Sequence, residues 1–292
     1  MPGPISVRSG SFQWKQFDIA YEHWGNQGPA CILMHGLLMD SVMNRGLARR
    51  FVKAGFQVVL LDLLGHGNSS KPTDPREHRI DFYGAQALAC MDHLGFDKAM
   101  MGGVSLGAIT TLDAAARAPE RITAMFLEMP VMEWSTTFAG ILLIPVLTAA
   151  QYLRGLFRPF ARTMRKLPRP RRNDLLSSVM NGMSAEPETI NAILHGVLAG
   201  PVVPPADVRR SLPMPSLVIG HDWDRLHSLR DAVALARELP NAKLLKASTA
   251  GFEIRAEDSH LWPEIQRFLD SVRDEQTGGT SNMSSQASQA TS

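Results

Sequence analysis

Runs of apolar residues alternate with amphipathic segments along most of this chain. Strand-like apolar patterns lie near residues 12–23, 30–34, 57–62, 98–103, 122–128, 215–220 and 243–247. Between them, apolar positions recur at helical intervals near 41–54, 80–95, 106–118, 229–239 and 260–272. The central strand patterns are unbroken, which is typical of strands covered on both faces. Strands that alternate with helices predict an α/β fold, with a mostly parallel central sheet and helices on both of its faces.

This alternation stops between residues 131 and 212. Residues 138–150 are almost wholly apolar, and the segment that follows spaces its large apolar side chains at helical intervals. The pattern predicts a helical cap over 131–212, inserted into a core formed by 1–130 and 213–272. Pro159 is expected to kink or divide a helix of this cap, because proline removes one backbone hydrogen bond.

The end of the chain differs from the rest. Residues 273–292 are mostly small and polar. Such a segment buries too little apolar surface to offset the entropy that ordering costs. The sequence therefore predicts a disordered tail over 273–292.

Composition excludes several classes of protein. The chain has 292 residues, of which 45% are hydrophobic, enough for one large core with an inserted cap. Its formal net charge of +2 gives no overall electrostatic case for nucleic acid. Cys31 and Cys90 lie in apolar patterns, which favours buried free thiols in a reducing compartment. No segment approaches the ~20 apolar residues that span a bilayer, and the N-terminus lacks a signal-peptide core. These features predict a soluble cytoplasmic protein.

The sequence Gly103-Val104-Ser105-Leu106-Gly107 carries the strongest chemical signal. It follows an apolar strand pattern and precedes an alanine-rich helical pattern. A sharp strand-to-helix turn exposes the serine in a strained conformation, and glycines are needed on both sides because a Cβ there would collide with the turn. This context predicts Ser105 as a nucleophile, whereas the five letters alone also fit a glycine-rich turn with a capping serine.

Two more loops follow predicted strands, at the sheet edge where α/β proteins bind ligands. His35 and Gly36 follow the strand pattern at 30–34, and the segment 62–69 contains Gly65-His66-Gly67. In their order and spacing, these loops and the serine turn resemble the α/β-hydrolase fold family. The resemblance covers roughly residues 12–128 and 213–272.

The resemblance implies a role for each of these loops. The backbone amides of Leu37 and Leu106 would form the oxyanion hole, which stabilises the developing negative charge by several kcal/mol. Gly36 would support the first loop. His35 and His66 are interpreted as residues that hold loop backbone, and Asp62 is expected to cap its own loop.

A serine nucleophile needs a histidine base and an acid that orients it. The family usually places the acid after the strand predicted near 215–220, where Asp224 occupies the expected position. Relatives often read His-Gly before this acid, but this chain reads Gly220-His221, which leaves Asp222 open as the acid. Glu128, after the preceding strand, is a further candidate.

The base is expected in the last loop before the final helix. Within that segment the chain offers His260, which makes the order Ser105, Asp224, His260 that is expected of this fold. His260 would deprotonate Ser105, form an acyl-enzyme and then activate water, without a metal or organic cofactor. An exposed histidine that caps the helix is the alternative interpretation.

The predicted substrate is a small-molecule carboxylic ester with an apolar acyl group. Epoxide hydrolases and haloalkane dehalogenases of this fold carry aspartate at the position of Ser105, so their chemistry is not expected. Thioesterases, carbon–carbon hydrolases and cofactor-free haloperoxidases share the same triad and stay open. A ligand-binding protein with little turnover is a further alternative, and the oligomeric state is left open.

Residues 151–172 hold eight Lys or Arg and no acidic residue. Arg154, Arg158, Arg162 and Lys166 recur every four residues opposite an apolar stripe. One hypothesis is a basic amphipathic helix that contacts anionic membrane. The other is a cap helix whose apolar stripe covers the acyl pocket while its arginines face water. Without interleaved aromatic residues, the segment does not indicate nucleic-acid binding.

Overall fold

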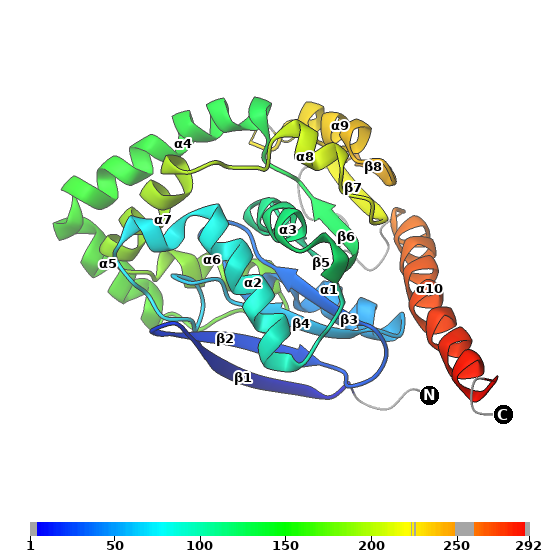
Figure 1. The fold of residues 1–292 in the computed structure, drawn as a ribbon. Helices are drawn as coiled ribbons and strands as arrows, with labels where there is room; N and C mark the ends of the chain where they lie inside the picture. The colour runs from blue at the N-terminus through cyan, green and yellow to red at the C-terminus, as the bar shows by residue number, and fades with distance from the viewer. Residues whose placement is uncertain (1–4, 223, 225, 249–259, 290–292) are drawn as a thin grey trace.

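The computed structural model describes residues 5–222, 224, 226–248 and 260–289 (Figure 1). Its centre is an eight-stranded sheet in the order β1-β2-β4-β3-β5-β6-β7-β8. The strands are β1 (Val7–Trp14), β2 (Phe17–Trp24), β3 (Ala30–Met34), β4 (Gln57–Leu61), β5 (Ala99–Val104), β6 (Ile122–Glu128), β7 (Ser216–His221) and β8 (Ala242–Ala247). From β4 to β8 all neighbouring strands are parallel, which confirms the predicted α/β class.

The strand pattern predicted near 12–23 is two strands. β1 and β2 form an antiparallel hairpin that pairs Val7 with Trp24 and Trp14 with Phe17. Lys15, in the turn, has a φ of 54°. The alternation changes phase at this turn, from Phe12 and Trp14 to Phe17 and Ile19, and two polar residues separate the two parts.

Helices cover both faces of the sheet. The core helices are α1 (Arg45–Lys53), α2 (Ile80–Leu94), α3 (Leu106–Arg117), α9 (Leu229–Glu238) and α10 (Trp262–Gln289), with short 3-10 turns at Ser41–Asn44, Pro75–His78 and Pro119–Arg121. Along β3, Ile32 and Met34 pack on the side of α2 and α3, whereas Cys31 and Leu33 pack on the side of α1 and α10. Cys31 and Cys90 are buried free thiols, as predicted.

Five helices lie between β6 and β7, in the segment predicted as a cap. They are α4 (Glu133–Tyr152), α5 (Arg154–Lys166), α6 (Asp174–Met183), α7 (Pro187–Ala199) and α8 (Ala206–Arg210). In Figure 1, α4 runs along the outer edge of the molecule on the cap side. The break between α4 and α5 lies at Leu153, while Pro159 is inside α5, so the prediction that Pro159 divides the helix is wrong.

Two further expectations need correction. α4 is long and apolar enough to cross a membrane by length and composition, although the sequence analysis expected no such segment. α10 continues to Gln289, so much of the predicted disordered tail is helical in the structure. Among the α10 residues up to 276, whose burial is described, the buried apolar side chains include Ile265, Leu269 and Val272.

Polar contacts attach the start of α4 to the core. The buried carboxylate of Asp231 accepts hydrogen bonds from the backbone amides of Met132, Trp134 and Ser135, at 3.1, 3.0 and 2.7 Å. The buried guanidinium of Arg209 contacts Glu133 at 2.9 Å and Glu238 at 2.6 Å. The helix that begins the cap is therefore anchored at its N-terminus.

Candidate active site

Ser105 occupies a sharp turn between β5 and α3. Its φ and ψ are 53° and −106°, in a region that residues with a side chain rarely adopt. A Cβ on Gly103 or on Gly107 would lie 2.4 Å from the carbonyl oxygen of Met34. Both glycines are thus required by space, as predicted, and the turn holds the Ser105 hydroxyl at the carboxyl edge of the sheet.

A histidine and an aspartate complete a hydrogen-bonded relay with this serine. His227 Nε2 lies 2.9 Å from Ser105 Oγ. On the other side of the ring, His227 Nδ1 lies 2.7 Å from Asp224 Oδ2. With Nδ1 protonated, the ring donates to Asp224 and presents Nε2 as an acceptor for the Ser105 hydroxyl. This arrangement can remove the proton from Ser105.

The environment keeps Asp224 ionised. Burial alone would raise the pKa of Asp224, but the hydrogen bond and charge of His227 outweigh it. The Asp224 Oδ1 atom also accepts hydrogen bonds from the amides of Leu226 and His227, at 2.8 and 3.0 Å. The net result is a pKa below the usual value for aspartate. Asp224 is therefore placed to orient the imidazole and to offset its positive charge after proton transfer.

The structure does not bring the predicted base, His260, to Ser105. The His260 side chain is exposed just before α10, and residues 249–259, which lead to it, lie outside the described residues. Its role as base stays a prediction from chain order. His227 was missed by the sequence analysis, although it follows Asp224 by three residues in the same loop.

The alternative acids are not part of the relay. Asp222 is exposed, and its backbone amide donates to Ala247. Glu128 is buried, with Oε1 3.6 Å from His221 Nε2, and its backbone carbonyl accepts a hydrogen bond from the Ser105 amide. Among the three carboxylates considered, Asp224 has the contact with His227.

The two amides expected to form an oxyanion hole border the same cavity as Ser105. Leu106 is the first residue of α3, where a backbone N–H has no acceptor within the helix. Leu37 lies in the loop after β3, next to Gly36, at which a Cβ would make only ordinary contacts. Both amides can therefore face an oxyanion formed on a substrate at Ser105, which stays a proposal.

His35 and His66 hold the surrounding loops. The amide of Leu63 donates to His35 Nε2 at 3.0 Å, and the amide of Leu38 donates to His66 Nε2 at 3.2 Å. Burial lowers the pKa of both imidazoles, which keeps them neutral and able to accept these hydrogen bonds. These contacts are consistent with their interpretation as residues that hold loop backbone, which stays a prediction.

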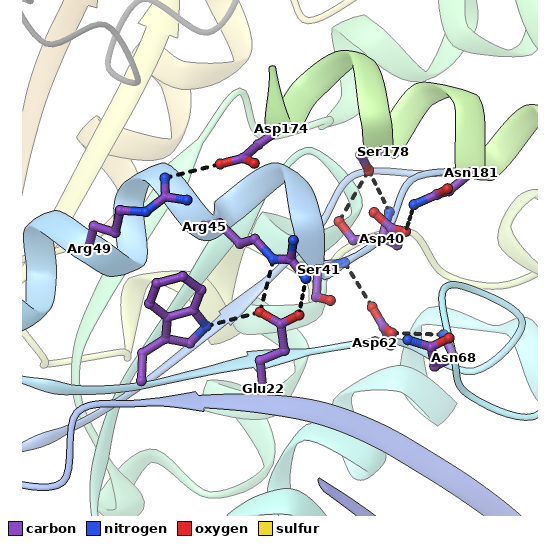
Figure 2. A network of polar contacts seen from close by, with 11 residues as sticks. Glu22, Asp40, Ser41, Arg45, Arg49, Asp62, Asn68, Asp174, Ser178 and Asn181 are labelled. Atoms are coloured by element: carbon purple, nitrogen blue, oxygen red, sulfur yellow. Dashed lines mark hydrogen bonds and ion pairs between the residues drawn. The ribbon is translucent and has the colours of Figure 1, made fainter. Parts of the chain in front are cut away.

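The loop after β3, residues 35–40, carries Leu37 and is called the oxyanion loop below. Polar contacts attach this loop to the cap (Figure 2). The Asp40 amide donates to Ser178 Oγ at 2.9 Å, and Asn181 Nδ2 donates to Asp40 Oδ2 at 2.6 Å. At Gly182, in the same helix α6, a Cβ would lie 1.8 Å from the carbonyl oxygen of Leu38. The backbone of α6 therefore presses directly on the loop that carries Leu37.

Asp62 accepts hydrogen bonds within its own loop, as predicted. Asp62 Oδ2 accepts from the Asn68 amide at 2.8 Å, within its own loop. Asp62 Oδ1 accepts from the Ser41 amide at 2.8 Å, which ties this loop to the end of the oxyanion loop (Figure 2). The loops after β3 and β4 are thus fixed to each other as well as to the cap.

A cavity of about 330 Å³ opens at Ser105. Most of its wall is apolar, with the core contributing Met43, Ile109 and Met129 and the cap contributing Leu143 and Val197. Among the described lining residues, the polar side chains are those of Ser105, Thr136, Asp224 and His227. The described residues contain no group of three or more His, Cys, Asp or Glu that could hold a metal ion.

Comparison with known protein families identifies the family of this fold. Residues 29–258 match the family model described as the alpha/beta hydrolase fold. The chain belongs to the α/β-hydrolase fold family. This confirms the family that the loop motifs indicated.

Curated relatives of this hydrolase-fold chain differ in their reactions. A 2-hydroxy-6-oxononadienedioate/2-hydroxy-6-oxononatrienedioate hydrolase from a Pseudomonas species is 28% identical over 211 residues, which are 69% of this chain and 72% of that protein. The dihydrolipoyllysine-residue acetyltransferase component of an acetoin cleaving system from Pseudomonas putida is 31% identical over 127 residues, 43% of this chain and 32% of that protein. In the latter case the chain spans about a third of its relative.

Solved structures share the fold at low sequence identity. A membrane phospholipase A has a TM-score of 0.72 and 20% identity, covering 92% of this chain and 87% of that one. An enol-lactonase from Burkholderia xenovorans has a TM-score of 0.68 and 20% identity, covering 92% of this chain and 100% of that one. At this identity the likeness establishes the fold, and the reaction has to be argued from the site.

Proposed function

We propose that the protein is a serine hydrolase that cleaves carboxylic esters with an apolar acyl group. The hydrogen-bonded relay of Ser105, His227 and Asp224 carries this proposal. A hydroxyl that contacts an oriented imidazole at the mouth of an apolar cavity is suited to attack an ester carbonyl. Membership of the α/β-hydrolase fold family supports a hydrolytic reaction.

The proposed reaction passes through an acyl-enzyme. The base takes the Ser105 proton as Oγ attacks the carbonyl carbon, and the Leu37 and Leu106 amides stabilise the oxyanion. The protonated histidine then gives its proton to the leaving alkoxide, which departs as an alcohol. Water, deprotonated by the same histidine, attacks the acyl-enzyme and releases the carboxylic acid and free Ser105.

Two histidines are candidates for the base. The distance of 2.9 Å to Ser105 Oγ supports His227, and we assign the role to it on this geometry. Chain order supports His260, because the fold usually supplies the base from the loop after β8. The two assignments predict opposite results from the same pair of substitutions.

The cavity favours a neutral apolar acyl group over an acidic substrate. No Lys or Arg occurs among its described lining residues, so a buried substrate carboxylate would lack a cationic partner there.

Cleavage of a carbon–carbon bond is the second candidate, supported by the 28% identity to the Pseudomonas hydrolase over 69% of this chain. Thioester cleavage uses the same relay. A cytoplasmic location stays a prediction, as does peripheral contact of residues 151–172 with anionic membrane.

Active-site labelling with a fluorophosphonate, alongside turnover of p-nitrophenyl esters, tests the proposal. We expect the native protein to be labelled and Ser105→Ala to lose both labelling and turnover. His227→Ala should lower kcat by roughly 10³-fold or more, as loss of a triad base does, while His260→Ala keeps most activity. The reverse result for the two histidines would assign the base to His260. A folded native protein that neither reacts nor turns over ester would refute the serine-hydrolase proposal.

A further inference from the structure

α4 is apolar on two opposite faces. One face carries Thr136, Ala139 and Leu143, which line the cavity at Ser105. The other faces solvent, where Ile141 is 65% and Ile144 is 55% exposed. The outer face consists mainly of Trp134, Phe138, Ile141, Leu142, Ile144, Pro145 and Tyr152. A soluble monomer rarely exposes so many neighbouring large apolar side chains without a binding role.

α5 extends this apolar surface and adds positive charge. Leu153, Leu156 and Phe160 are exposed, and no residue of α5 is among the described residues that line the cavity. The hypothesis that the apolar stripe of 151–172 covers the acyl pocket is therefore wrong. The pocket is covered by α4 and α7 instead, which leaves the stripe on α5 facing outward.

Positive charges outnumber negative ones along this surface. No charged residue occurs between 134 and 153, whereas residues 151–172 hold eight Lys or Arg and no acid. Glu188 contacts Arg158 at 2.6 Å, and Glu186 pairs with Arg165, so acids of α7 and the turn before it offset part of this charge. Arg162 and Lys166 are exposed on the same helix. An apolar face bordered by cations is the pattern of a helix that binds an anionic membrane surface.

The contacts of α4 with the rest of the protein bear on whether it could cross a membrane. Its N-terminus is held by Asp231 and by the ion pair of Arg209 with Glu133. Its inner face packs on α7, where Ala150 clusters with Ile190 and Leu194. A spanning helix would have to give up these contacts, whereas an interfacial helix keeps them and buries only its outer face.

We propose that the outer faces of α4 and α5 dock the protein on an anionic lipid bilayer. A second copy of the chain is less suited to this surface, because symmetric pairing would bring two basic segments together. Since the inner face of α4 lines the cavity, docking also places the proposed ester site next to the bilayer. That last step rests on the proposed function, whereas the docking itself does not.

A flotation assay tests the docking surface. It compares vesicles of phosphatidylcholine alone with vesicles that also contain about one third phosphatidylglycerol, which is anionic. The full chain should float with the anionic vesicles. The double variant Ile141→Ser/Ile144→Ser should bind them at least about tenfold more weakly, because two exposed apolar side chains no longer enter the bilayer. Arg162→Glu/Lys166→Glu should lose the preference for phosphatidylglycerol. Val7→Ser, at an exposed apolar residue on β1, is the matched control and should bind like the native chain.

The same experiment in a Ser105→Ala background separates docking from catalysis. Flotation should be unchanged there, and turnover of a water-soluble short ester should be unchanged in the α4 double variant. Equal flotation of the native chain and the double variant would overturn the proposal, as would absence of flotation with both vesicles. A dimer that dissociates on Ile141→Ser/Ile144→Ser, measured by sedimentation without lipid, would instead assign the surface to a second copy.

Discussion

Asp40 links the oxyanion loop to the cap through a carboxylate that is almost fully buried. One oxygen accepts from Asn181, whereas Oδ1 has no hydrogen-bond partner among the described residues. Burial raises the pKa of Asp40, and the nearby charge of Asp62 raises it further against the opposing hydrogen bonds of Ser178 and Asn181. Folding therefore shifts the titration of Asp40 toward the protonated form.

This shift predicts a pH dependence of stability that Asp40→Asn removes. The folded chain binds the Asp40 proton more tightly than the unfolded chain, where aspartate titrates near about 3.9. The stability contributed by the protonated carboxyl is present at low pH and is lost as pH rises through the raised pKa. The free energy of unfolding of Asp40→Asn minus that of the native chain, both from urea titrations, should therefore increase as pH rises above about 4, until the raised pKa of Asp40 is passed. A difference that is constant over this range would contradict the shift.

Single residues of the site could be predicted where the chemistry depends on local sequence. Gly103 and Gly107 flank Ser105 because of backbone contacts within one turn, which a five-residue pattern can record. The histidine that contacts Ser105 could not be predicted in the same way. Which histidine reaches Ser105 depends on how the loops after β7 and β8 lie in space, and the spacing along the chain does not determine that. His227 therefore emerged only from the structure.

At the scale of elements, the contact between α9 and α4 determines how the cap begins. Three amides at the start of α4 donate to the buried Asp231, and Ser135 Oγ accepts from the Ser228 amide at 2.8 Å. A negative charge at a helix N-terminus also interacts favourably with the helix dipole. The cavity roof formed by α4 thus depends on one side chain of the core.

Replacing Asp231 should therefore weaken both stability and substrate binding. Asp231→Ala leaves two buried amides and one partly buried amide without their acceptor, and we expect a loss of about 3 kcal/mol in the free energy of unfolding. KM for an apolar ester should rise, because the roof carrying Ala139 and Leu143 is no longer held. Asp231→Asn, which keeps one acceptor oxygen, should lose less. Unfolding by urea and ester kinetics measure the two effects, and an Asp231→Ala variant with native stability and KM would show that the contact is dispensable.

The elements were predicted well where burial leaves a clear pattern of apolar residues. The unbroken apolar runs gave the parallel strands, because strands covered by helices on both faces carry few polar residues. The cap helices were predicted less well. α4 is apolar on its inner and outer faces, so its period did not reveal which face meets the pocket. The boundary between α4 and α5 lies at Leu153, and the position of Pro159 did not indicate it.

At the scale of the whole molecule, the core and the cap have different parts in the proposed reaction. The sheet edge supplies Ser105, the relay and the two amides, and α4 and α7 close an apolar cavity above them. The polar contacts of Asp40 and Asp231 hold the cap in its position above Ser105. Changes in the cap should therefore alter the choice of acyl group more than the reaction itself.

The length of the acyl group provides the test of this division. Each added CH₂ that enters the cavity should raise kcat/KM about fourfold, corresponding to about 0.8 kcal/mol of burial, until the space is filled. Ala139→Trp reduces that space from the roof without touching the relay. Its optimum should therefore shift to shorter p-nitrophenyl esters, while turnover of the acetate stays close to native. A kcat/KM that does not change with acyl length in the native chain would place the acyl group outside this cavity, because the apolar walls could then not be its binding site.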